Sequence, residues 1–194
     1  MRLAHGWRIT GPRDPAVTQA VRAVPRAMAA RLGPCGVQLA ERPGFGSRWR
    51  RTAAGLEVVV ATAGVTPHDV ALELLLCLGQ ALWETTTPAE REAWWTLLGG
   101  EIEAGVLGEI DEDALGEKRA LLTGRASARS RRRFLRYARA SFSATAAEYV
   151  HCLWHDVTVR TGTPHLAPRW LRRRLQLMAG WFPPNPGYAL FPLQ

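Results

Sequence analysis

The spacing of hydrophobic positions changes after the first third of the chain. In that third, an apolar stripe in residues 14–32 predicts a helix, and apolar runs at 36–41 and 55–62 predict two strands. From residue 67 onward apolar residues recur every three or four positions, so the remaining chain is predicted to be helical. The helices expected there cover 67–84, 111–122, 127–142, 144–159 and 168–181, and a further one begins at 87–88.

This order of elements predicts an α+β fold that is mostly helical, with a small N-terminal β-sheet followed by a helical bundle. The length fits a single domain over residues 1–194 with a core of about 14–182. Pro25 is expected to bend the first helix. Residues 42–53, rich in Pro, Gly and Arg, predict a loop, and the Pro-rich tail 183–194 is expected to lie extended on the surface.

The composition of the chain predicts where in the cell the protein resides. No apolar run reaches the length that crosses a bilayer, and the N-terminus lacks the apolar core of a signal peptide. Three widely spaced cysteines form neither a disulfide framework nor a zinc knuckle. We therefore expect a cytoplasmic, bacterial protein that does not associate with membranes.

The net charge of +8 conceals two blocks of opposite sign. Residues 84–117 contain ten acids against Arg91 alone, whereas residues 118–139 contain Lys118 and eight arginines without an acid. One interpretation is that the two segments neutralise each other across the fold. The other is that the basic block forms a surface for nucleic acid or another polyanion.

Residues 75–82 read LLCLGQAL and follow the strongest predicted strand. They resemble the active-site helix of the minimal gluzincins, the compact thermolysin-like zinc metallopeptidases, in which this stretch often reads LHELGHAL. A second element, Ala147-Glu148-Tyr149, is similar to the part of a later helix from which that family takes its third metal ligand. The resemblance covers roughly residues 14–182 and implies a zincin-like domain.

The resemblance also implies that the peptidase chemistry has been lost. Leu76 would occupy the first metal-ligand position and Gln80 the second, and neither side chain replaces an imidazole. Cys77 would occupy the general-base position, where a thiol does not replace a carboxylate. Glu148 would remain as the third ligand, and one carboxylate does not make a catalytic zinc site. No catalytic residue and no cofactor are therefore expected.

A different group of candidate ligands lies on the predicted helix 144–159. Glu148, His151, Cys152 and His155 fall within an arc of about 100° on a helix, and the two histidines have the i, i+4 spacing of metal-binding pairs. Zinc bound by His151, His155 and either Glu148 or Cys152 is the corresponding hypothesis. The alternative is the polar face of an ordinary amphipathic helix.

Two arginine-rich stretches, in 127–142 and 169–174, indicate a third possibility. Arginines projecting from two helices near Trp or Tyr side chains can contact phosphates and stack on bases, although no nucleic-acid-binding motif is present. The candidate nucleic-acid-binding residues are Arg129, Arg132, Arg133, Arg136, Arg139, Arg169, Arg172 and Arg173.

The sequence thus supports three hypotheses of different classes. The leading one is a catalytically inactive, metallopeptidase-like domain (a pseudoprotease) that binds a peptide or protein partner or regulates it. The second is a nucleic-acid-binding protein that uses the arginine-rich helices. The third is a metal-dependent hydrolase built on Glu148, His151 and His155.

Overall fold

The computed structural model of this protein describes residues 1–41, 46–123, 128–155 and 164–191, except for the side chains of residues 128 and 129. A four-stranded sheet has the order β1-β2-β4-β3. The central strand β2 runs parallel to β1 and β4, while β3 runs antiparallel to β4 at the edge. The strands are β1 (Arg8–Thr10), β2 (Cys35–Ala40), β3 (Arg48–Thr52) and β4 (Gly55–Ala61).

The two predicted strands are confirmed as β2 and β4, but the predicted loop at 42–53 is wrong where β3 forms. Its side chains are exposed or half-buried rather than alternately buried, so the apolar period of two that marks a strand is missing. Pairing with β4 compensates, because Arg50 lies opposite Glu57 and its Nε donates to that carboxylate at 2.6 Å. Residues 42–45 lie outside the described chain.

Most predicted helices are confirmed, and one predicted boundary is wrong. Residues 127–142 and 144–159 were expected to form two helices, but a single helix of 27 residues, Ala128–Trp154, continues across position 143. Residues 127 and 156–159 of these predictions lie outside the described chain. The hydroxyls of Ser143 and Thr145 donate to carbonyls four residues earlier, so these polar side chains continue the helix instead of ending it. The helices are α1 (Pro15–Ala23), α2 (Arg26–Leu32), α3 (Pro67–Trp83), α4 (Pro88–Glu103), α5 (Glu112–Leu122), α6 (Ala128–Trp154) and α7 (Pro168–Trp181), with a 3-10 turn η1 (Ala4–Gly6).

Local sequence explains where the helices begin. Asp14 accepts hydrogen bonds from two backbone N–H groups at the start of α1, and Thr87 and Glu90 form a reciprocal capping box at the start of α4. Proline occupies the first position of α1, α3, α4 and α7, where its missing N–H costs no hydrogen bond. At Pro25 the expected bend is a full break, which separates α1 from α2.

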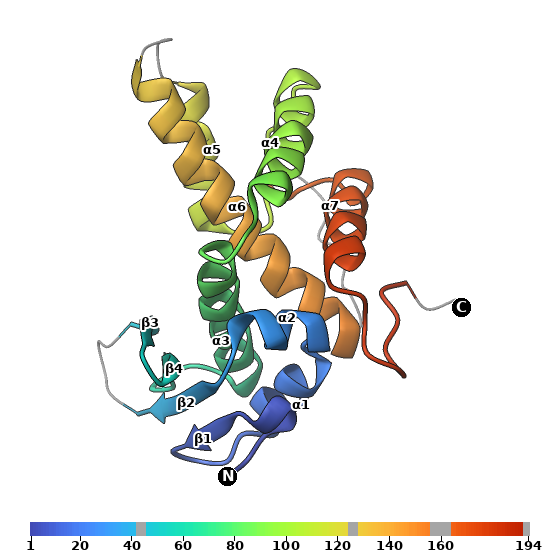
Figure 1. Ribbon diagram of the computed structural model, residues 1–194. Helices are drawn as coiled ribbons and strands as arrows, with labels where there is room; N and C mark the ends of the chain where they lie inside the picture. The colour runs from blue at the N-terminus through green and yellow to red at the C-terminus, as the bar shows by residue number, and fades with distance from the viewer. Residues whose placement is uncertain (42–45, 124–127, 156–163, 192–194) are drawn as a thin grey trace.

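Helix α6 forms the spine of the molecule (Figure 1). Helices α1, α3, α4, α5 and α7 contact it, whereas the sheet packs on α3. One continuous core joins the sheet, α1–α3 and α6, and includes Trp7, Trp94 and Phe142. The C-terminal segment returns to the N-terminal helices, where Asn185 accepts from the N–H of Arg26. Among the described helices, none is long and apolar enough to cross a bilayer.

Candidate functional site

Helices α3 and α6 pack against each other at Gly79. A Cβ atom at this position would stand 2.5 Å from the carbonyl oxygen of Ser143, so only glycine permits this close approach. The helix that resembles the metallopeptidase motif and the helix that carries Glu148 are therefore direct neighbours. Leu76 and Glu148 line the same cavity between them.

This cavity has a volume of about 700 Å³ and is bounded by α3, α6 and the segments at 109–112 and 164–166. Its lining includes no Lys or Arg among the described residues, although the whole protein carries a net charge of +8. The acidic groups that line it are Asp69, Glu73, Glu109, Asp111, Glu112 and Glu148. The cavity therefore favours cationic ligands.

A second hollow, of about 500 Å³, adjoins the first because Leu76 and Asp111 line both. Gln80 lines this second part, together with Arg136 and Arg139 from α6. The two hollows form one groove with Leu76 at their junction, and we call this the α3–α6 groove. Its first part is acidic and its second part carries mixed charge.

The three motif positions of α3 face different surroundings. Leu76 lies at the junction of the groove, whereas Cys77 is buried in the core. Burial, with a smaller effect of the Glu73 charge, raises the pKa of the Cys77 thiol to about 12, so the thiol is neutral near pH 7. Gln80 is exposed, and its Oε1 accepts a hydrogen bond of 2.9 Å from the indole of Trp49 in the edge strand β3.

The rival candidate ligands on α6 are partly brought together. Glu148, His151 and His155 line the acidic part of the groove, but Cys152 belongs to the hydrophobic core. Burial and the neighbouring Glu148 raise the pKa of the Cys152 thiol above its ordinary value, and its Sγ lies 3.6 Å from a Glu148 oxygen. Cys152 is therefore not a groove residue, contrary to the arc expected from helical spacing.

The structure places a third histidine, which helical spacing within α6 does not predict, beside His151 and His155. His68, in the first turn of α3, lies with its ring centre 5.0 Å from that of His151 and 4.9 Å from that of His155. The rings of His151 and His155 are 5.2 Å apart, and Trp154 packs against all three. Helical spacing could have indicated that His68 faces the groove. Residues four apart share a helix face, and steps of four back from Leu76 reach Leu72 and then His68, both of which line the cavity.

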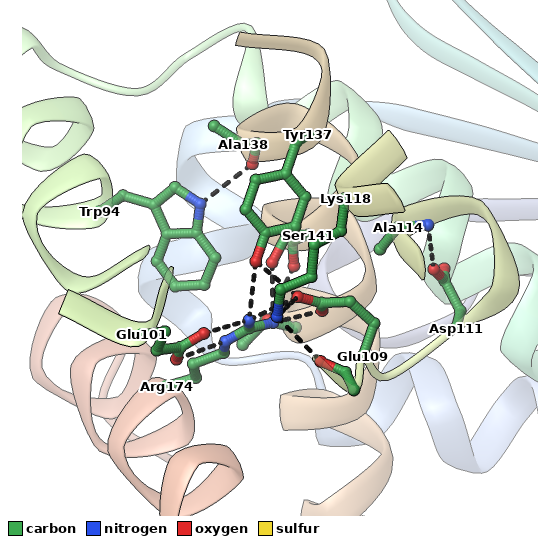
Figure 2. A network of polar contacts seen from close by, with 12 residues as sticks. Trp94, Glu101, Glu109, Asp111, Ala114, Lys118, Tyr137, Ala138, Ser141 and Arg174 are labelled. Atoms are coloured by element: carbon green, nitrogen blue, oxygen red, sulfur yellow. Dashed lines mark hydrogen bonds and ion pairs between the residues drawn. The ribbon is translucent and has the colours of Figure 1, made fainter. Parts of the chain in front are cut away.

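Beside the groove, Arg174 of α7 is completely buried in a network of polar side chains (Figure 2). Its Nε donates to Glu101 of α4 at 2.9 Å, and its Nη1 donates to Glu109 at 2.7 Å. Glu109 also accepts from Tyr137 at 2.6 Å and from the buried Lys118 at 3.1 Å. These bonds join α4, α5, α6 and α7. Each buried charge in the network has a partner of opposite sign, which offsets the cost of burying it.

This network fixes the segment that forms one wall of the groove. Burial opposes the ionisation of Glu109, but the charges and hydrogen bonds of Arg174 and Lys118 outweigh it and lower the pKa to about 2. Two residues on, Asp111 caps α5 by accepting from Ala114 at 2.7 Å. Burial raises the pKa of Asp111 to about 6, despite that bond.

The arginine-rich surfaces are smaller than the sequence indicated. Arg174, part of the 169–174 stretch, is buried, and Lys118 of the basic block is buried too. Arg136 pairs with Glu117 at 3.2 Å and Arg139 with Glu84 at 3.0 Å, as expected if the two charge blocks neutralise each other.

The remaining candidate arginines are exposed or half-buried, but several already contact aromatic rings. Arg169 and Arg173 lie over Trp170, at 5.1 and 4.7 Å from the ring centre, and Arg172 lies over Phe191 at 4.4 Å. Arg132 is exposed and Arg133 is half-buried on α6, while the side chain of Arg129 lies outside the described structure.

Comparison of this chain with protein-family models, with curated proteins and with solved structures finds no match in any of the three.

Proposed function

We propose that this protein is a catalytically inactive, metallopeptidase-like module that binds a basic peptide segment in the α3–α6 groove. The observation that supports this proposal is the groove itself, which is acidic in its first part, has an aliphatic side chain at its centre and lies next to an edge strand.

Charge favours a basic ligand over an acidic or neutral one. Asp69 and Glu73 line the cavity from α3 and Glu112 lines it from α5, and no Lys or Arg side chain lines it among the described residues. A Lys or Arg side chain of a peptide would neutralise these carboxylates, while an acidic peptide would be repelled. The other end of the groove carries both signs of charge, because Arg136 and Arg139 lie there together with acidic side chains.

The edge strand offers a second means of holding an extended peptide. Strand β3 pairs with β4 on one side, and it is the last strand in the order of the described sheet. The Trp49–Gln80 hydrogen bond joins this strand to the second part of the groove. A peptide that adds to a sheet edge gains backbone hydrogen bonds, and the adjoining pockets then select its side chains.

The centre of the groove is suited to binding and not to hydrolysis. Leu76 offers no electron pair to a metal, and the Cys77 thiol lies in the core with its pKa raised to about 12. A bound peptide would meet an aliphatic surface where the metallopeptidases that this chain resembles place zinc and a general base. We therefore expect peptides to be bound and released intact.

Fluorescence anisotropy with labelled extended peptides tests the proposal. Basic peptides should bind more tightly than acidic peptides of the same length, and binding should weaken as salt is added. The double variant Glu73→Gln/Glu112→Gln should bind basic peptides roughly tenfold more weakly, because two groove charges are lost. Mass spectrometry after incubation with zinc should recover the peptides uncleaved.

The matched control is Glu92→Gln/Glu103→Gln, which removes the same charge from exposed positions on α4 outside the groove. This control should change affinity by less than about twofold. Equal affinity for acidic and basic peptides, or an equal loss in both double variants, would contradict the proposal, and so would zinc-dependent cleavage of the bound peptide.

A further inference from the structure

We propose that His68, His151 and His155 form a binding site for one divalent transition-metal ion of the zinc class at the acidic end of the α3–α6 groove. This site lies apart from positions 76 and 80 and draws on both helices. It goes beyond the peptide binding proposed above, because it concerns a different ligand held by different residues.

The spacing of the three rings supports the assignment. Their centres are separated by 5.0, 4.9 and 5.2 Å, so they form a nearly equilateral triangle. Zinc–nitrogen bonds of about 2.0–2.1 Å in tetrahedral geometry place the centres of ligating imidazoles roughly 5 Å apart. Three histidines already stand at that separation, although two come from α6 and one from α3.

The rings must turn before they can coordinate. In the part of the chain that the structure describes, no group of three His, Cys, Asp or Glu side chains is arranged around a common metal position. Rotation about the Cβ–Cγ bond spins an imidazole about an axis through its own ring centre, and this torsion is soft. The nitrogens can therefore be redirected while the separation of the ring centres is kept.

His151 provides an independent observation. Both of its ring nitrogens are buried, and neither makes a hydrogen bond within the described structure. Its Nδ1 lies 3.4 Å from a Glu148 oxygen, close enough for an ionic contact although the geometry is not that of a hydrogen bond. A metal bound at Nε2, with Nδ1–H turned to Glu148, would satisfy both nitrogens, as carboxylates commonly do for metal-binding histidines.

The surroundings favour a cation at this position. His151 and His155 lie at the C-terminal end of α6, where the helix dipole stabilises positive charge. His68 lies at the opposite, unfavourable end of α3, but Asp69 and Glu73 line the same cavity. The Trp154 ring centre lies 5.5–5.9 Å from those of the three imidazoles.

The donor set also selects the class of ion. Three imidazoles suit Zn²⁺, Co²⁺, Ni²⁺ or Cu²⁺, whereas Mg²⁺ and Ca²⁺ require oxygen ligands. With Glu148 held against His151, three imidazoles would leave a fourth position for water or for a group of a bound peptide.

Calorimetric titration of untagged, chelator-stripped protein with Zn²⁺, together with the visible spectrum of the Co²⁺ form, tests the site. We expect one ion per chain and a tetrahedral Co²⁺ spectrum. Each of His68→Asn, His151→Asn and His155→Asn should weaken binding at least roughly 100-fold, whereas Glu148→Gln should weaken it by about 10- to 100-fold. The control His5→Asn removes a histidine outside the cluster and should leave binding unchanged.

Zn²⁺ should also raise the melting temperature of the wild type and of His5→Asn, but not of the three cluster variants, whose metal-free forms should melt close to the wild type. Less than about a tenth of an equivalent of bound Zn²⁺ would overturn the proposal, and so would wild-type affinity in His68→Asn. Peptide binding by the chelator-stripped protein is measured separately, so failure of the metal site and failure of the peptide groove are distinguishable.

Discussion

Gly79 of α3 lies against the backbone of α6 so closely that a methyl group on its Cα would stand 2.5 Å from the carbonyl oxygen of Ser143. The close contact between the two helices that bound the groove therefore depends on residue 79 having no side chain. Because Ser143 contributes backbone here, the contact cannot be relieved by rotating a side chain.

We predict that Gly79→Ala destabilises the protein by about 1–3 kcal/mol, since α6 must shift to admit the new Cβ. Urea unfolding followed by Trp fluorescence measures the change. The control is Gly116→Ala in α5, where a Cβ meets open space. It should stabilise the protein by up to about 1 kcal/mol through helix propensity. A neutral Gly79→Ala would show that the helices are not in this close contact.

Arg174→Met should destabilise the protein by about 3–5 kcal/mol, because Glu101 would be left buried without a cation and Glu109 would keep only Lys118. Lowering the pH from 7 toward 4 should partly restore the stability of this variant, since protonation removes the uncompensated charges. Arg172→Met, at an exposed position two residues before Arg174 on the same helix, should change stability by less than about 0.5 kcal/mol. Denaturant titrations at several pH values give the comparison.

Asp111 and Glu109 give opposite contributions to the pH dependence of stability. The pKa of Glu109 is lowered to about 2, so its contribution is present above pH 4.5 and is lost as the pH falls toward 2. The pKa of Asp111 is raised from 3.8 to about 6, so the folded state holds this proton more tightly and loses stability as the pH rises through that interval.

Asp111→Asn should separate these two effects, because asparagine retains the cap on α5 but cannot ionise. Relative to the wild type, the variant should gain roughly 1–3 kcal/mol between pH 4 and pH 6. Unfolding free energies measured across this range test the prediction. A difference that does not change with pH would show that Asp111 titrates normally.

The three cysteines should resist thiol reagents while the protein is folded. All three are buried, and burial raises the pKa of each thiol, to about 12 for Cys35 and Cys77. Ellman's reagent should label few thiols in native buffer and all three in denaturant. Rapid labelling of Cys77 in the native protein would show that it faces the groove and not the core.

The sequence predicted what depends on local periodicity and on capping. The apolar runs of β2 and β4 and the Pro-initiated helices α3 and α7 were visible in the pattern, whereas at Pro25 only a bend was expected where the helix breaks. Strand β3 was not, because its polar side chains pair with β4 across a tight turn and bury little surface. The continuity of α6 was missed because Ser143 and Thr145 bond to the helix itself.

The sequence predicted only part of the candidate site, for a different physical reason. Glu148, His151 and His155 share one helix, so their proximity follows from a spacing of three and four residues. His68 joins them only through the packing of α3 on α6, and the partners of Arg174 come from α4, from α6 and from the segment at 109. Contacts between elements distant in the chain are set by tertiary packing, which the pattern of a single sequence does not encode.

Asn185 bonds to Arg26 and Val24, at the break between the first two helices, across about 160 positions of the chain. During synthesis, the opening helices therefore emerge from the ribosome long before the side chain that secures their junction exists. The break between α1 and α2 therefore lacks these hydrogen bonds until nearly the whole protein has been translated. Ribosome-bound chains arrested before position 185 should for this reason be more sensitive to protease at residues 24–26 than the released protein.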